Sequence, residues 1–146
     1  MHLHPPAIVT TETKMTSLPI DVKAKTFIWI TTSFEGFHKY PDAPEGVEFL
    51  KYEHRHIFHV KVWIEVFHDD RDIEFILFKR YINTLLTNNQ MDYKSCEMMS
   101  DDLYLQIAEK YPFRDVHIEI SEDGENGSLK QYICKPLQSI RTGGPY

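Results

Sequence analysis

Residues 54–68 read HRHIFHVKVWIEVFH, and their hydrophobicity alternates with a period of two. Successive side chains of a β-strand point to opposite faces, so this pattern is typical of a strand with one apolar and one mixed face. We predict a long strand from Arg55 to His68. Its apolar face would carry Phe58, Val60, Val62, Ile64 and Val66, and its mixed face His59, Lys61, Trp63 and Glu65.

The flanking segments change period in an orderly way. Residues 25–34 are rich in β-branched and aromatic side chains and predict a strand, whereas residues 35–53 contain glycines and prolines that are typical of a loop. From Ile73 the apolar residues follow a helical period, which places Phe75 and Phe78 in the core, and a second helix is predicted from Ser95 or Cys96 to Lys110. Residues 115–121 alternate again, and the DGENG sequence at 123–127 predicts a hairpin whose second strand covers residues 128–134.

This order of elements, strand, strand, helix, helix, strand, strand, indicates an α+β fold. We expect a four-stranded antiparallel sheet with both helices on one face. Such a sheet has two exposed edges, and we expect subunits of an oligomer to join their sheets there. Residues 1–22 have no sustained period and predict a flexible arm, residues 23–138 form the predicted domain, and residues 139–146 a frayed tail.

Composition excludes several classes of function. The chain has 146 residues, enough for one domain, with 16 basic and 22 acidic residues and a net charge of −6. This balance argues against nucleic acid as a partner, because phosphate binding needs a basic surface. No apolar run is long enough for a membrane span, and no export signal is recognisable. We therefore expect a cytoplasmic protein with Cys96 and Cys134 reduced.

Three histidines suggest a metal site. His54 and His56 are two residues apart, so on a strand they point to the same face, and His38 follows the preceding strand. Three imidazoles with one open position are the ligand set of a catalytic zinc. The alternative for His38 is an ordinary loop histidine, and surface strands carry such a pair as His54 and His56 by chance.

Five motifs in residues 25–134 resemble one known family. They are FEGFH at 34–38, HRH at 54–56, EFILFK at 74–79, SCE at 95–97, and Glu122 with Gly127 after the third strand. Together with the order of elements, they resemble the 6-pyruvoyl-tetrahydropterin and 6-carboxytetrahydropterin synthases, which have the tunnelling fold. The family's zinc pair is His-Gly-His, so Arg55 stands here in place of glycine.

The resemblance implies a zinc-dependent lyase or isomerase that acts on a compound like dihydroneopterin triphosphate. Zn²⁺ would be bound by His38, His54 and His56, and the pterin ring by Glu122, with help from Ser95. A carboxylate can accept the two adjacent N–H groups of a pterin or guanine edge in a forked, charge-assisted pair. Glu122 alone could also be a solvated turn residue, and Ser95 a helix cap. The family's subunits assemble into rings, so a trimer or hexamer is expected.

Two departures from the family concern the catalytic base. The family's cysteine lies four residues before the zinc pair, where this chain has Leu50, and residues 88–94 lack the family's partner histidine. Glu53 and Glu48 are weak candidates for a replacement, and both could be plain surface charges. General acid–base help is typically worth about 10²–10⁴-fold in rate. The alternative function is therefore a non-catalytic binder that holds a nucleotide- or pterin-like ligand at the subunit interfaces of a ring.

Overall fold

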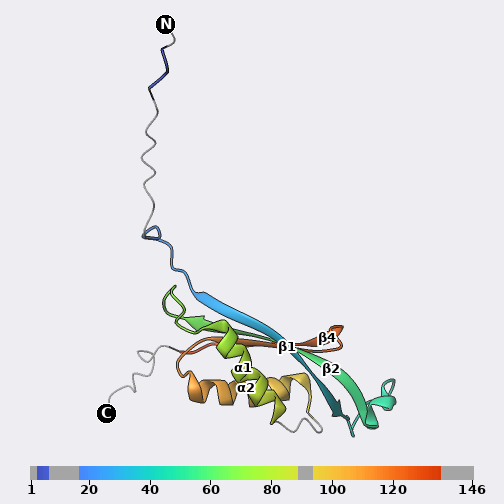
Figure 1. Cartoon of the computed structure of the whole chain (residues 1–146). Helices are drawn as coiled ribbons and strands as arrows, with labels where there is room; N and C mark the ends of the chain where they lie inside the picture. Colours follow the sequence, from blue (N-terminus) through green and yellow to red (C-terminus); the bar gives the residue numbers. More distant parts are fainter. Residues whose placement is uncertain (1–2, 7–16, 89–93, 136–146) are drawn as a thin grey trace, which may run out of the picture.

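The computed structural model describes residues 3–6, 17–88 and 94–135. It confirms the α+β class: a four-stranded antiparallel sheet in the order β1-β2-β3-β4, with two helices on one face (Figure 1). The tunnelling fold and the sharing of sheets between subunits remain predictions. In chain order the elements are β1 (Thr26–His38), a 3-10 turn (Glu48–Lys51), β2 (His54–Val66), α1 (Phe75–Thr87), α2 (Cys96–Lys110), β3 (Val116–Glu122) and β4 (Asn126–Tyr132).

The core lies between the sheet and the helices. The predicted apolar face of β2 is confirmed, since Phe58, Val60, Val62, Ile64 and Val66 are all buried. Helix α1 packs against β1, and α2 packs against β3 and β4. Each helix contributes an apolar stripe: Phe78, Ile82 and Leu86 from α1, and Met99, Leu103 and Ile107 from α2.

The strand predicted at 55–68 is His54–Val66 and the strand predicted at 128–134 is Asn126–Tyr132. Two other expectations are wrong. The first strand does not end at Phe34 but continues to His38, because residues 35–38 pair with residues 54–57 of β2. Backbone pairing along the whole length of β2 outweighs the low strand propensity of Gly36. Phe75, which shares the helical period of α1, is not a core residue: its exposed fraction is 57%. Phe75 is the first residue of α1, and the buried positions of this helix begin only at Phe78.

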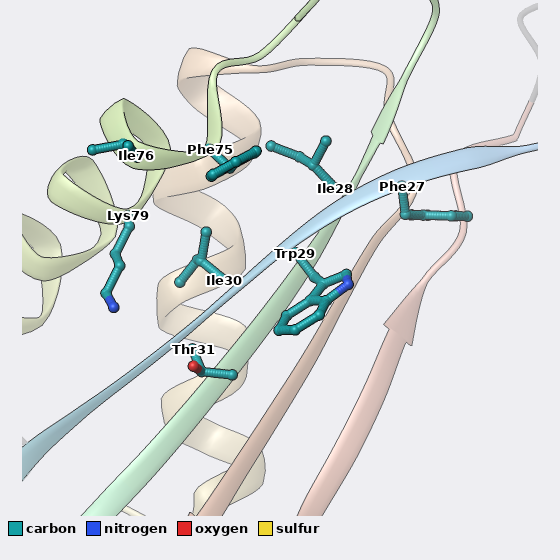
Figure 2. Close-up of a pocket in the computed structure, with 8 residues that line it drawn as sticks. All are labelled: Phe27, Ile28, Trp29, Ile30, Thr31, Phe75, Ile76 and Lys79. Carbon is teal, nitrogen blue, oxygen red and sulfur yellow. The ribbon is translucent and has the colours of Figure 1, made fainter. Parts of the chain in front are cut away.

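Phe75 instead lines an apolar groove between α1 and the edge strand β1 (Figure 2). The groove lies at the opposite end of β1 from His38, and Figure 2 shows the side chains of Phe75 and Ile28 facing each other across it. It is lined by Phe27, Ile28, Trp29, Ile30, Thr31, Phe75, Ile76 and Lys79.

The structure describes only parts of the predicted arm and of the predicted domain's C-terminal end. Of the predicted arm, residues 1–2 and 7–16 lie outside the described residues, as do the domain's last residues, 136–138, and the predicted tail, 139–146. These boundaries therefore stay predictions. No helix within the described ranges has the length and apolar character to cross a membrane.

The β3–β4 hairpin supplies a first prediction, at Gly127. A Cβ at this position would lie 2.2 Å from the carbonyl oxygen of Ile120 and 2.6 Å from Cα of Ser121. Both are backbone atoms, so no rotamer change relieves the clash. We expect Gly127→Ala to lower the free energy of unfolding by about 3 kcal/mol, the upper end of the usual cost of overpacking. Urea denaturation measures this loss.

The control is Leu129→Thr on the same strand, where the side chain is 55% exposed. It is expected to change the free energy of unfolding by no more than about 0.5 kcal/mol. Equal stabilities of the Gly127 variant and this control would contradict the tight hairpin contact.

Candidate metal centre

The core face of the sheet changes from apolar to polar at one end. Phe34 and Phe58 face each other across β1 and β2, and their rings stack with centroids 5.1 Å apart. Beyond this pair, His38 lies opposite His54, and His56 lies opposite Gly36. The histidines therefore share the face of the buried core residues, at the end of the sheet.

The glycine at position 36 makes room for the ring of Phe58. A Cβ at Gly36 would lie 3.0 Å from an edge carbon of the Phe58 ring. Phe58 in turn packs edge-on against His38 and His56, with ring centroids 5.3 and 5.8 Å away. The glycine thus leaves room for the phenyl ring that supports two of the histidines.

The three predicted histidines converge. One ring nitrogen each of His38, His54 and His56 lies within 4.8 Å of the others. The ring centroids are 4.4 Å apart for His38 and His54, 5.1 Å for His38 and His56, and 4.8 Å for His54 and His56. Within the described ranges this is the one group of three or more His, Cys, Asp or Glu side chains close enough to bind a metal ion.

Each ring has an acceptor beside its Nδ1 atom. His38 Nδ1 lies 3.2 Å from the carbonyl oxygen of Lys94, and His54 Nδ1 lies 2.8 Å from that of Tyr52. His56 Nδ1 lies 2.7 Å from Oδ2 of Asp123. Since a carbonyl or carboxylate oxygen only accepts, each Nδ1 donates its hydrogen, and a neutral ring then keeps a free lone pair on Nε2. This is how proteins usually hold metal-binding histidines.

Two of the Nε2 atoms face the carboxylate of Glu122. Glu122 Oε1 lies 3.2 Å from Nε2 of His38, and Oε2 lies 3.5 Å from Nε2 of His56. The Nε2 atoms of His54 and His56 are buried and have no hydrogen-bond partner among the described residues. A neutral ring that donates from Nδ1 has no hydrogen left for Glu122, and a cation bound by the three Nε2 atoms would satisfy their lone pairs.

Burial favours the neutral form of His38. It is the largest influence on the pKa of His38 and, with the nearby His54 and His56, lowers it below the ordinary value. The Lys94 carbonyl and Glu122 act in the opposite direction but do not outweigh it. A neutral imidazole is the form that binds a metal ion, so His38 is suited to bind a metal rather than an extra proton.

The other candidate residues are placed as follows. Ser95 caps α2, its Oγ accepting from the amide of Met98 at 3.2 Å, and any contact of Ser95 with a ligand stays a prediction. Glu53 is exposed. Glu48 is exposed too, and hydrogen bonds from its own amide and that of Gly46 hold the pKa of this carboxyl below its ordinary value. A lowered pKa makes a carboxylate a weaker base.

Sequence reasoning gave no role to three groups that hold the rings. Two are the backbone carbonyls of Tyr52 and Lys94, which carry no sequence signal. The third, Asp123, follows Glu122 in the hairpin turn. Hydrogen bonds from His56 and the Ile57 amide lower its pKa, so the carboxylate stays charged. Cys96 lies near the cluster, but burial, aided by the charges of Glu122 and Glu97, raises the pKa of its thiol to about 11.

No family model and no curated protein matches this chain.

Proposed function

We propose that this chain is a zinc-dependent lyase or isomerase, similar to the pterin synthases, that acts on a compound like dihydroneopterin triphosphate. The observation that supports it is the convergence of three imidazoles, each with Nδ1 bound to an acceptor, beside the carboxylate of Glu122. Three imidazole nitrogens are a ligand set that catalytic zinc sites use.

Zinc, when bound, supplies a Lewis acid that polarises a carbonyl or hydroxyl oxygen and lowers the pKa of bound water to about 7. The chain's own residues supply binding and orientation. His38 and His56 are held by the Phe58 ring and by their Nδ1 partners, so their Nε2 atoms are fixed before a ligand arrives. Pre-organised ligands of this kind lose little entropy when they bind.

Glu122 is the proposed anchor for the substrate ring. It ends β3 on the same face as the histidines, and its side chain is 30% exposed, so a ligand can reach it. Its two oxygens would accept the two adjacent N–H groups of a pterin or guanine edge. Because both oxygens already lie at the histidine cluster, a heterocycle held there would place its side chain beside the metal.

The proposed assembly is a homo-oligomer, a trimer or hexamer, joined through the sheet edges. Strands β1 and β4 are the edges of the sheet, and β1 is 13 residues long. The face without helices also carries large exposed residues, Trp29 and Leu129 among them, each more than half exposed. Long unpaired edges of this kind are usually paired or covered in soluble proteins.

A second candidate function is a non-catalytic binder of a pterin- or nucleotide-like ligand. The observation that favours it is the lack of an evident base: Leu50 occupies the position of the family's cysteine, and Glu48 and Glu53 are exposed. In this function the metal and Glu122 would hold the ligand between subunits without converting it.

The experiment that separates the two begins with zinc measured by mass spectrometry on the purified protein. The protein is then incubated with dihydroneopterin triphosphate, and the mixture is analysed by liquid chromatography. Turnover that requires zinc supports the enzyme. Stoichiometric retention of the ligand without product supports the binder. A protein that binds neither zinc nor the pterin contradicts both.

A further inference from the structure

Asp123 joins the hairpin turn to strand β2 by three hydrogen bonds. Its Oδ2 accepts from Nδ1 of His56 at 2.7 Å, and its Oδ1 accepts from the amide of Ile57 at 2.9 Å. Its own amide donates to the carbonyl oxygen of Ile57 at 2.7 Å. The carboxylate therefore has one oxygen fixed by the backbone and the other aimed at the imidazole.

Asp123 differs from the partners of the other two rings. His38 and His54 contact backbone carbonyls, which cannot donate and cannot be altered by substitution of a side chain. His56 is the ring whose Nδ1 partner is a side chain. The orientation of His56, and the nitrogen that carries its hydrogen, can therefore be changed at one position.

We propose that Asp123 is a positioning residue of the metal centre, which keeps His56 in the Nδ1–H tautomer and presents its Nε2 lone pair to the ion. The inference rests on the proposed zinc site. A carboxylate that accepts from the far nitrogen of a metal ligand fixes the ring and raises its basicity, and loss of such a partner typically costs about 10–100-fold in metal affinity.

Asp123→Asn tests the tautomer with little change of shape. The amide oxygen can still accept from Ile57, but its NH₂ group then faces Nδ1 of His56 and needs an acceptor there. The ring is expected to move its hydrogen to Nε2, where it blocks the metal. The backbone of Asp123 is left-handed, with φ of 56°, a conformation that asparagine tolerates well.

Two further variants separate positioning from folding. Asp123→Gly suits the same backbone and removes both side-chain hydrogen bonds without imposing a wrong tautomer. Glu125→Gln removes one negative charge from the same exposed turn. If Asp123 only stabilises the turn, glycine should weaken zinc binding more than asparagine. If Asp123 sets the tautomer, asparagine should weaken it more.

The first measurement is ¹⁵N NMR of the imidazole nitrogens in metal-free protein. We expect His56 to carry its hydrogen on Nδ1 in the unsubstituted chain and on Nε2 in Asp123→Asn. The second is a competitive zinc titration, with folding checked by circular dichroism. We expect a loss of about 10–100-fold for Asp123→Asn, a smaller loss for Asp123→Gly, and less than about 2-fold for Glu125→Gln.

The outcomes separate the two proposals. An unchanged tautomer in Asp123→Asn, or a zinc affinity equal to that of Glu125→Gln, overturns the role of Asp123. So does a larger loss in Asp123→Gly than in Asp123→Asn. Failure of the unsubstituted chain to bind zinc overturns the proposed metal site instead, and the NMR measurement still decides whether Asp123 orients His56.

Discussion

His54→Ala is expected to lower zinc affinity by more than about 100-fold, beyond the usual cost of losing an outer partner. It removes one of three converging nitrogens. Among the residues that the structure describes, the buried Nε2 atom of His54 has no hydrogen-bond partner. A competitive titration with a chromophoric chelator measures the loss, and turnover of dihydroneopterin triphosphate should fall with it if the protein is an enzyme.

His59→Ala is the matched control for this variant. It removes the same side chain from the same strand, but residue 59 has the opposite parity to 54 and 56 and lies exposed on the face without helices. Its zinc affinity should stay within about 2-fold of the unsubstituted chain, since surface substitutions rarely have larger effects. Equal losses in both variants would mean that zinc binds elsewhere or without specificity.

Phe58→Ala is expected to lower the free energy of unfolding by about 3–5 kcal/mol, the range for removal of a buried phenyl ring. The side chain is fully buried, stacks on Phe34, and contacts His38 and His56 edge-on. A typical domain is stable by only about 5–15 kcal/mol, so this is a large fraction. Urea denaturation followed by circular dichroism measures the change.

The control for Phe58 is Phe49→Ala, whose ring is 69% exposed. This variant should differ from the unsubstituted chain by no more than about 0.5 kcal/mol. The Phe58 variant should also bind zinc less tightly, because two ligands lose the ring they pack against. A loss of stability below about 1 kcal/mol would contradict the central place of Phe58 in the core.

Much of the sheet could be predicted because β2 carries a strong local pattern. The alternation of residues 58–66 identifies the buried face, and the structure confirms each of its five apolar positions. The end of β1 could not be predicted in the same way. Residues 35–38 have weak strand character of their own and are extended because they pair with β2.

The candidate site, too, could be predicted only in part. His54 and His56 share a face because they are two residues apart, and this needs only local geometry. The position of Glu122 beside them depends on the pairing of β2 with β3, in which Glu122 lies opposite Phe58. The contact of Asp123 with His56 could not be predicted, because a carboxylate in an acidic turn has no feature that marks its partner.

The sequence by itself therefore determined the order of the elements, the buried face of β2 and the position of His54 and His56 on one face of a strand. These follow from periodicity, which is a property of neighbouring residues. Only the tertiary structure decided that His38 lies opposite His54, that Glu122 reaches His38 and His56, and that Asp123 holds His56. The register of one strand against another depends on side chains packing across the sheet, such as Phe34 on Phe58 beside Gly36, and these contacts join residues far apart in the chain.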